Sequence, residues 1–474
     1  MIDFNEIRKA ICVLPSDHDA SGQHRPTVDE IFAPEQHANA LDPNTNIVVG
    51  ARGTGKSFWA GVLTQKATLA VAAKSYPHLG LEKLTVLSGY DGFTPSRTID
   101  DLVPKGEEHV QGFRFWMATI IKTIEEHLIP KSRSKVSSIM RALLTTEDFF
   151  ERLEDLDEEL GVRNNNIIIV FDALDKLSKE WGRSTKLLDS LFEVVWDLRI
   201  RKNIRAKIFI RPEQLNDEAL SFIEIPKLRS SRVELEWNQT ELYGLLFSRL
   251  SKAASKINFN KFCMEIGVAP IYDNIRRWPL AYNKSIQKEA MSLLAGPYMG
   301  KNYKKGGTYD WPYKHLADAN GKVTPRSFIK LFVEAAKYTS ENAGKAINPE
   351  GIRHGLREAS KVRVEQLVIE YVWIKRALAP LAGLKVPCNV EEVFERWNSS
   401  DTVDVIMAAS KEIGFLPPFP PITAGHSGNE ALAEAMERIG LIEYRNDGRM
   451  DIPDLFRVAA MMLKKGGTPP LGKK

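Results

Sequence analysis

Residues 46–62 read NIVVGARGTGKSFWAGV. An apolar run, 47–49, enters a glycine-rich turn, and an apolar segment compatible with a helix leaves it, which is the setting of the G-x-x-x-x-G-K-[ST] phosphate loop. Gly50 and Gly55 have no Cβ, so successive backbone N–H groups can point into one concavity that holds phosphate oxygens. The stretch therefore predicts a phosphate-binding loop, and the alternative is an ordinary glycine turn before a helix.

Two side chains of this loop have an expected chemical role. The helix that begins near Lys56 directs its positive dipole end at the bound anion, and Lys56 is expected to reach the β- and γ-phosphates. The Ser57 hydroxyl is expected to ligate Mg²⁺. The predicted binding residues are Gly50, Ala51, Arg52, Gly53, Thr54, Gly55, Lys56, Ser57 and Phe58.

The length and composition limit the class of protein. A chain of 474 residues suggests two to four domains, and its formal charge of +4 is too small to indicate a nucleic-acid or membrane surface by itself. The three cysteines are far apart and in no metal-binding spacing, which fits a reducing compartment. We see no signal peptide and no run of about 18 apolar residues, so we expect a cytoplasmic protein without a membrane partner.

Strands alternate with helical spans over residues 46–211, which predicts a wound α/β domain with a parallel sheet and helices on both faces. Residues 27–40 read as a short helix before the first strand, which would either cover the adenine side of a nucleotide or cap the sheet. Further strands are expected at 82–88, 167–171 and 207–210.

A second half of the site is expected in IIIVFDALD, residues 167–175. This apolar run suits a strand that is buried on both faces, and Asp172 at its end would hold Mg²⁺ opposite Ser57. The alternative is a strand that simply ends in a turn. Many ATPases of this class carry Glu directly after that Asp, whereas this chain has Ala173. Asp175 would polarise the attacking water, or it would cap the following helix.

A third strand ends in KIFIRP, residues 207–212. Its Arg211 would lie beside the site and sense the γ-phosphate through a bidentate contact. The alternative is that Arg211 pairs with a local carboxylate such as Glu213.

The set GARGTGKS, IIIVFDALD and KIFIRP resembles the STAND and KAP-type P-loop ATPases, which are related to AAA+ proteins. The resemblance covers about the first half of the chain and implies ATP as the nucleotide. The absence of an Asn-Lys-x-Asp motif agrees with an adenine base. In AAA+ relatives a helical lid carries an Arg near a helix start, and GKVTPRSF, residues 321–328, is similar, with Arg326 as the lid sensor. The alternative is a plain helix start with Pro325 in its first turn.

The C-terminal part, 429–463, reads as helix, hairpin and helix, because Asn446-Asp447-Gly448 is a strong hairpin turn. This pattern resembles a winged helix. Arg445 and Arg449 on the wing would contact nucleic-acid phosphates, or the unit would be a latch on the nucleotide domain; the acidic preceding helix favours the latch. The basic loop 301–305, KNYKK, is compatible with nucleic-acid binding or is simply solvated.

These observations predict an order of domains and a function. We expect an N-terminal extension (1–45), a P-loop ATPase domain (46–238), a helical lid (239–385) and a winged-helix-like domain (386–474). The resemblance implies an ATP- and Mg²⁺-dependent molecular switch, slow in hydrolysis, that forms a homo-oligomer and controls a protein effector in bacterial antiphage defence. The alternative is a DNA-binding, initiator-like AAA+ ATPase that uses its winged helix.

Overall fold

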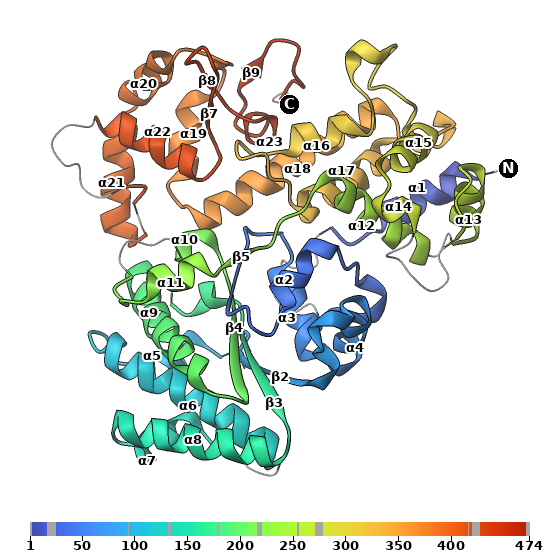
Figure 1. Ribbon diagram of the computed structural model, residues 1–474. Helices are drawn as coiled ribbons and strands as arrows, with labels where there is room; N and C mark the ends of the chain where they lie inside the picture. Colours follow the sequence, from blue (N-terminus) through green and yellow to red (C-terminus); the bar gives the residue numbers. More distant parts are fainter. Residues whose placement is uncertain are drawn as a thin grey trace. The chain divides into compact units, whose positions relative to one another are not determined.

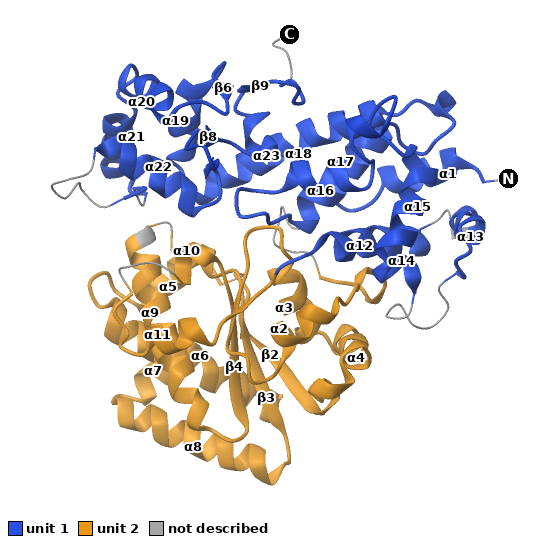
Figure 2. Ribbon diagram, turned by 45° about the horizontal axis from the view of Figure 1, so that its top comes forward, with its two compact units in different colours: residues 1–17, 236–474 blue, residues 18–235 orange. Residues whose placement is uncertain are grey.

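The computed structural model describes residues 2–16, 25–92, 94–130, 134–178, 180–215, 220–253, 256–270, 278–415, 417–419 and 427–470. The chain divides into two compact units, which are coloured separately in Figure 2. One unit is His18–Leu235, and the other joins Met1–Asp17 to Glu236–Lys474. The finer division into four domains stays a prediction.

The unit His18–Leu235 is built on a parallel sheet, as the sequence predicts. Its described residues form five strands in the order β2-β3-β4-β1-β5, and every pair that the register records is parallel. One row of residues crosses the sheet from Tyr90 through Phe171 and Ile208 to Ile47. The strands are β1 (Ile47–Val49), β2 (Leu84–Tyr90), β3 (Asn166–Phe171), β4 (Ile204–Ile210) and β5 (Val233–Glu234).

Each face of this sheet is covered by helices (Figure 1). Alternate residues of β3 enter different cores: Ile167 and Ile169 join one, Ile168 and Val170 the other. This is why β3 is apolar throughout rather than alternating. The first core packs against α5 (Ser96–Leu102), α6 (Glu108–Leu128), α7 (Val136–Ala142), α8 (Thr146–Val162), α9 (Trp181–Asp197) and α11 (Ile225–Ser230). The second packs against α2 (Ala38–Leu41), α3 (Lys56–Thr64) and α4 (Lys66–Ser75).

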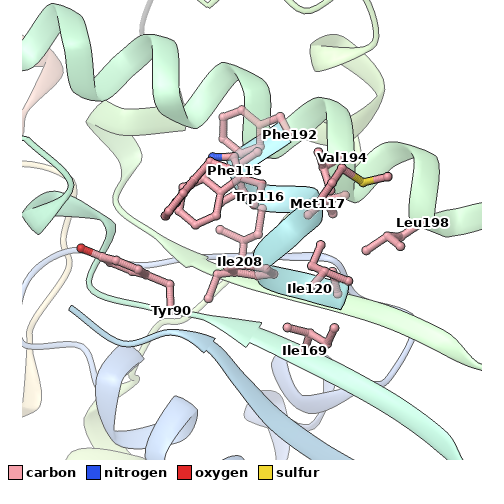
Figure 3. Packing of buried hydrophobic residues seen from close by; sticks show 14 of the residues in the cluster. Tyr90, Phe115, Trp116, Met117, Ile120, Ile169, Phe192, Val194, Leu198 and Ile208 are labelled. Atoms are coloured by element: carbon pink, nitrogen blue, oxygen red, sulfur yellow. The ribbon is translucent and has the colours of Figure 1, made fainter. Parts of the chain in front are cut away.

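Trp116 of α6 is the centre of the first core (Figure 3). Its side chain is fully buried, and its indole N–H donates to the Leu187 carbonyl of α9 at 2.8 Å. The ring lies edge-on to both Tyr90 and Phe171, so it contacts two adjacent strands. Burial of such a side chain contributes roughly 1.5–3 kcal/mol or more. This contact fixes α6 and α9 over β2 and β3.

The segment before β1 is not the single helix that the sequence predicts over residues 27–40, so that prediction is wrong. It forms two short 3₁₀ turns, Val28–Glu30 and Glu35–His37, and then α2. Pro34 stands between the turns in an extended conformation, and proline cannot supply the N–H that a continuous helix would need there. The segment packs in the second core, where the hydroxyl of Tyr76, the residue after α4, donates to the Pro34 carbonyl at 2.6 Å.

The other unit is largely helical. Its longest pair is α17 (Pro325–Tyr338) against α18 (Pro349–Glu370), which approach closely because glycines face the partner backbone. A Cβ on Gly355 would lie 2.1 Å from the Leu331 carbonyl oxygen. Other helices are α1 (Phe4–Cys12), α12 (Gln239–Lys252), α13 (Lys256–Glu265), α14 (Pro279–Tyr282), α15 (Lys284–Ala295), α16 (Asp310–Leu316) and α19 (Ile374–Leu378).

The C-terminal region has the order of helix, hairpin and helix that the sequence predicts. The helix α22 (Gly428–Arg438) precedes an antiparallel hairpin of β7 (Glu443–Tyr444) and β8 (Met450–Asp451). Cys388 forms an isolated antiparallel β-bridge with Met450, and β6 (Lys385–Val386) pairs in parallel with β9 (Leu463–Lys464). The remaining helices here are α20 (Val390–Asn398), α21 (Thr402–Ile413) and the short α23 (Asp454–Arg457). The expected last helix is therefore only one turn long.

The described part of the chain contains no helix that is both long enough and apolar enough to span a membrane.

Candidate phosphate-binding site at the sheet edge

The strand order brings three predicted residues to one edge of the sheet. Gly50 follows β1, Arg211 follows β4 and Asp172 follows β3, and these three strands are neighbours. The carboxyl ends of parallel strands share an edge, so β4 separates the phosphate loop from Asp172 by two strand spacings, about 10 Å between β1 and β3. Gly50 still belongs to the ladder, since its N–H donates to the Ile210 carbonyl at 3.1 Å. Ligands of open α/β sheets bind at such an edge.

The backbone of the loop has the conformations that its glycines predict. Gly53 has a φ of 86° and Gly55 a φ of 107°, in the left-handed region that side chains with a Cβ rarely adopt. At Gly50 the limit is space, because a Cβ there would lie 2.5 Å from the Thr54 hydroxyl oxygen. Thr54 is buried, and its hydroxyl donates to the Ala51 carbonyl at 2.8 Å. The loop is therefore a closed turn immediately before α3.

Lys56 is held by the loop itself. Its ammonium donates to the carbonyl oxygens of Gly50 at 2.6 Å and Ala51 at 3.2 Å. A phosphate oxygen at the loop would compete with these carbonyls for the same protons. Ser57 follows on the first turn of α3, half-buried at the same end of the helix.

A buried contact behind the loop was not predicted from the sequence. The Trp59 indole N–H of α3 donates to Nδ1 of His37 at 3.1 Å, and both side chains are almost fully buried. This bond joins α3 to the segment before β1. The HANALD run that holds His37 carries no periodic signal, so sequence reasoning had no means of finding this partner.

Asp172 is buried at the end of β3, and its N–H donates to the Tyr90 carbonyl of β2 at 2.8 Å. Ala173 after it has a φ of 54°, which is unusual for a residue with a Cβ. A Cβ on Gly92 would lie 2.9 Å from the Ala173 Cβ, so the loop after β2 approaches this turn closely. The position that holds Glu in many ATPases is thus a tight backbone turn here.

Arg211 contacts two carboxylates. Its guanidinium lies 2.7 Å from the Asp175 carboxylate and 3.7 Å from that of Glu213. The local pair with Glu213, which the sequence offers as the alternative, therefore exists in the structure. The closer partner of Arg211 is Asp175, which lies in the 3₁₀ turn Leu174–Lys176. The pair joins the ends of β3 and β4. The sensor role of Arg211 and the catalytic role of Asp175 stay predictions.

Tyr90 is a second residue that sequence reasoning missed. It ends β2, is buried, and its hydroxyl makes no hydrogen bond within the described ranges. Figure 3 shows the phenol oxygen directed away from Trp116 and Ile208. Burial, followed by the charges of Asp175 and Asp91, raises the pKa of Tyr90 well above its usual value. The phenol therefore stays protonated, next to the carboxylate that holds Arg211. Its only signal in the sequence is a polar atom at the end of a strand.

The other predicted residues lie in the unit that contains the C-terminus. Arg326 is the second residue of α17, whose N-cap is Thr324, and its role as a lid sensor stays a prediction. Arg445 donates twice to the buried Asp451, at 2.6 and 3.0 Å, and Arg449 pairs with Asp447 at 2.7 Å. Both wing arginines thus have carboxylate partners within the hairpin.

The donor set at the sheet edge fits Mg²⁺ bound together with a nucleotide. Among the described residues no group of three His, Cys, Asp or Glu side chains could hold a metal ion. Mg²⁺ is characteristically held by one or two carboxylates and by substrate phosphates, with water completing its shell. Asp172 and the Ser57 hydroxyl would provide the protein ligands of such an ion.

Comparison with family models gives no match, and comparison with curated proteins gives none. Among solved structures, the chain is similar to the Aeropyrum pernix ORC2 protein in ADPNP–ADP complexes, with 15% identity and a TM-score of 0.41 over 93% of this chain and 96% of that one. It is similar to the Walker-type ATPase PABY2304 of Pyrococcus abyssi, with 16% identity and a TM-score of 0.36 over 92% and 97%. It is also similar to the Aeropyrum pernix ORC1 protein in complex with DNA, with 15% identity and a TM-score of 0.36 over 96% and 94%. These likenesses are loose, so the assignment of a P-loop NTPase fold rests on the sheet order and on the loop geometry.

Proposed function

We propose that this chain binds ATP with Mg²⁺ at the loop 50–57 and acts as a nucleotide-dependent molecular switch. The observation that carries the proposal is the meeting of the glycine loop, Asp172 and Arg211 at one edge of a parallel sheet. The loop amides and Lys56 would hold the phosphates, while Ser57 and Asp172 would hold Mg²⁺. The ion, when bound, neutralises charge on the β- and γ-phosphate oxygens.

Arg211 is the residue through which the phosphate state would be read. In the structure its charge is shared between Asp175 and Glu213. A γ-phosphate carries more charge than either carboxylate and can accept a bidentate contact, so ATP would draw Arg211 away from Asp175. ADP lacks that group and would leave the pair intact. The turn Leu174–Lys176 would then differ between the two nucleotide states.

Hydrolysis would be slow in this scheme. Ala173 provides no carboxylate directly after Asp172, and Asp175 is occupied by Arg211 at 2.7 Å. When Arg211 turns to the γ-phosphate, Asp175 becomes free to polarise a water molecule. The same event would therefore complete the site and supply its base, which suits a switch better than a rapid motor.

The resemblance to STAND and KAP-type ATPases supports a protein effector as the output, with antiphage defence as the setting and a homo-oligomer as the active form. An Arg326 at the start of α17 would report the nucleotide state to the helical region. These parts of the proposal rest on the resemblance alone.

A DNA-binding, initiator-like ATPase is the second candidate, and the winged-helix element order of residues 374–464 favours it. The pairing of Arg445 and Arg449 with carboxylates weakens its predicted wing contact, because a phosphate would first have to displace Asp451 and Asp447. If Arg449→Gln lowers the affinity for DNA, the predicted contact between the wing and DNA is supported. If the affinity is unchanged, that contact is excluded.

The proposal is tested by measuring phosphate release and particle mass together. With ATP and Mg²⁺ we expect slow release above the Lys56→Ala background and a larger particle than with ADP. Lys74→Ala, which removes an exposed lysine of α4, is the matched control and should behave as the wild type. Equal phosphate release by the wild type and Lys56→Ala would exclude hydrolysis at this loop, and an unchanged mass would exclude nucleotide-dependent assembly.

A further inference from the structure

The loop between α15 and α16 is an ordered hairpin-like projection. Tyr298 and Gly307 form an antiparallel bridge across its base, and the Met299 N–H donates to the Gly306 carbonyl at 2.8 Å. The Thr308 hydroxyl, itself buried, donates to the Gly296 carbonyl at 2.5 Å. The Arg353 guanidinium of α18 donates to the Met299 carbonyl at the base of the loop. Its base is therefore fixed to the body of its unit.

The tip of this loop, residues 301–305, is exposed and basic. None of Lys301, Lys304 and Lys305 forms an ion pair with any residue that the structure describes. Tyr303 between them is 70% exposed and has no aromatic neighbour in the described chain. We call these five residues the basic tip.

The basic tip is also held in one shape. The Asn302 side chain accepts from the Lys304 N–H at 3.2 Å and closes a 3₁₀ turn, Tyr303–Lys305. The stem of Lys305 lies over Gly300, where a Cβ would be only 2.8 Å from the Lys305 Cγ. Gly306 follows with a φ of 85°. A preformed tip loses less conformational entropy on binding than a free loop would.

The charge around the tip is concentrated. Residues 290–309 contain three lysines, all of them in the basic tip, and no Asp or Glu. In the wing, by contrast, each of the two arginines already has its own carboxylate.

We propose that the basic tip binds single-stranded nucleic acid, with phosphates on the three lysines and a base stacked on Tyr303. A positive surface combined with an exposed ring is what backbone tracking and base stacking require. Stacking needs an unpaired base, so a single strand fits better than a duplex. Anionic membranes are typically bound by clusters of about four to eight Lys or Arg, whereas the tip has three lysines. An acidic protein partner would be expected to meet an apolar interface core, which the tip does not offer. This proposal does not depend on the nucleotide site.

Fluorescence anisotropy of a labelled 20-nucleotide oligo-dT, measured without nucleotide, tests the proposal. Replacement of Lys301, Lys304 and Lys305 by Gln should weaken binding at least about tenfold and reduce the slope of log K against log salt by about 2, because each phosphate contact on a single strand contributes about 0.7. Tyr303→Leu should weaken binding about tenfold or more without changing the slope, because stacking carries no counterion release.

A matched triple variant controls for net charge. Lys66, Lys74 and Lys83 are exposed lysines of the other unit, and their replacement by Gln should leave oligo-dT binding unchanged. Circular dichroism of all variants checks that they fold. Equal loss in the two triple variants, or tighter binding of a 20-base-pair duplex than of oligo-dT, would overturn the proposal. The proposal would also be overturned if the tip lysines were needed to bind polyglutamate or phosphatidylserine vesicles and Tyr303→Leu left that binding unchanged. The first result would indicate an acidic protein as the partner, and the second a membrane.

Discussion

Arg211 shows most clearly what single residues contribute to the account. It is a cation at the end of β4, beside the phosphate loop, yet its charge is held by Asp175 and Glu213. A switch needs two states of similar free energy, and an exchange of one carboxylate for a phosphate would provide them. The difference between ATP and ADP would then appear as a choice of partner by one guanidinium.

Asp175→Asn tests this exchange. The amide cannot form the ion pair, so Arg211 should be more available, and the affinity for ATP should rise by about fivefold, equivalent to about 1 kcal/mol. The affinity for ADP should stay unchanged, because ADP has no γ-phosphate. Titration calorimetry with both nucleotides measures the ratio, and Asp175→Glu is the conservative control. A fall in ATP affinity, or equal changes for ATP and ADP, would contradict the exchange.

The strand, glycine turn and helix start over residues 46–62 were predictable because the pattern is local and lies within seventeen consecutive residues. The partner of Arg211 was not, because Asp175 lies 36 positions earlier and meets it only through the strand order. The Glu213 pair was foreseen for the opposite reason, since it is only two residues away.

Lys207 shows that a buried charge can be structural. It points from β4 into the core without exposure, and its ammonium donates to the carbonyls of Ala40, Asp42 and Thr45 at 2.6–3.0 Å. Burial lowers the pKa of Lys207 to about 7, although the charge of Asp42 opposes this shift. The three acceptors belong to the turn that enters β1, so this lysine fixes the approach to the phosphate loop.

Lys207→Met should destabilise the protein by about 2–4 kcal/mol, because one buried and two partly buried carbonyls would lose their donor. Thermal unfolding followed by circular dichroism measures the effect. Lys202→Met, at an exposed position before the same strand, is the control and should change stability by less than about 0.5 kcal/mol. Equal melting temperatures for Lys207→Met and the wild type would show that the three carbonyls find other partners.

At the scale of elements, the packing of α17 on α18 depends on glycine rather than on large side chains. Gly351 and Gly355 lie one turn apart, and a Cβ on either would meet a carbonyl oxygen of α17 at 2.5 or 2.1 Å. Backbone cannot move as a flexible side chain can. The two helices can therefore approach as they do only while both positions lack a side chain.

Gly355→Ala should destabilise the protein by at least about 2 kcal/mol, because the added methyl group would force the helices apart. Chemical denaturation measures the change, and loss of the cooperative transition would also count as the predicted result. The control is Gly182→Ala, a glycine in the first turn of α9 with open space around its Cβ position, which should change stability by less than about 0.5 kcal/mol. Similar effects of the two substitutions would contradict the packing argument.

The short helix α23 is fixed by a buried carboxylate. Asp454 pairs with Arg457 at 2.7 Å and contacts His315 of α16. Burial alone would raise the pKa of Asp454, but the bond to His315 and the charge of Arg457 outweigh it and lower the pKa from 3.8 to about 2. The carboxylate therefore joins the C-terminal region to α16.

This shift predicts how stability depends on pH. A carboxyl group whose pKa is lower in the folded state stabilises above its unfolded pKa, and the contribution is lost as the pH falls from about 4 through 2. The shift is equivalent to about 2 kcal/mol. The gap in unfolding free energy between the wild type and Asp454→Asn should therefore be largest near pH 7 and close as the pH approaches 2. A gap that stays constant over this range would show that the charge of Asp454 does not stabilise α23.

Elements with a strong periodic signal were predictable, and those decided by tertiary contacts were not. The apolar run 167–171 predicted β3 correctly because a strand that is buried on both faces must be apolar throughout. The segment 27–40 failed because Pro34 interrupts it and Tyr76 holds the extended stretch from the end of a distant helix. The final helix of the C-terminal region was overestimated: it ends at Arg457, whose side chain is fully buried and donates to the Thr468 carbonyl.

At the scale of the whole molecule, the two units divide the proposed work. The unit His18–Leu235 contains the phosphate loop, Asp172 and Arg211, and the other unit contains the basic tip and the winged-helix-like region. A nucleotide-dependent switch requires that binding in the first unit change something in the second. The predicted lid residue Arg326 lies in that second unit, at the start of α17.

The central claim is that ATP binds at the loop 50–57 with Mg²⁺ held by Asp172, and equilibrium titration of fluorescent ATP tests it most directly. The account predicts that the wild type and Lys74→Ala bind ATP equally, that Lys56→Ala abolishes binding, and that Asp172→Asn removes the dependence of affinity on Mg²⁺. ATP binding by Lys56→Ala with the affinity of the wild type would contradict the account.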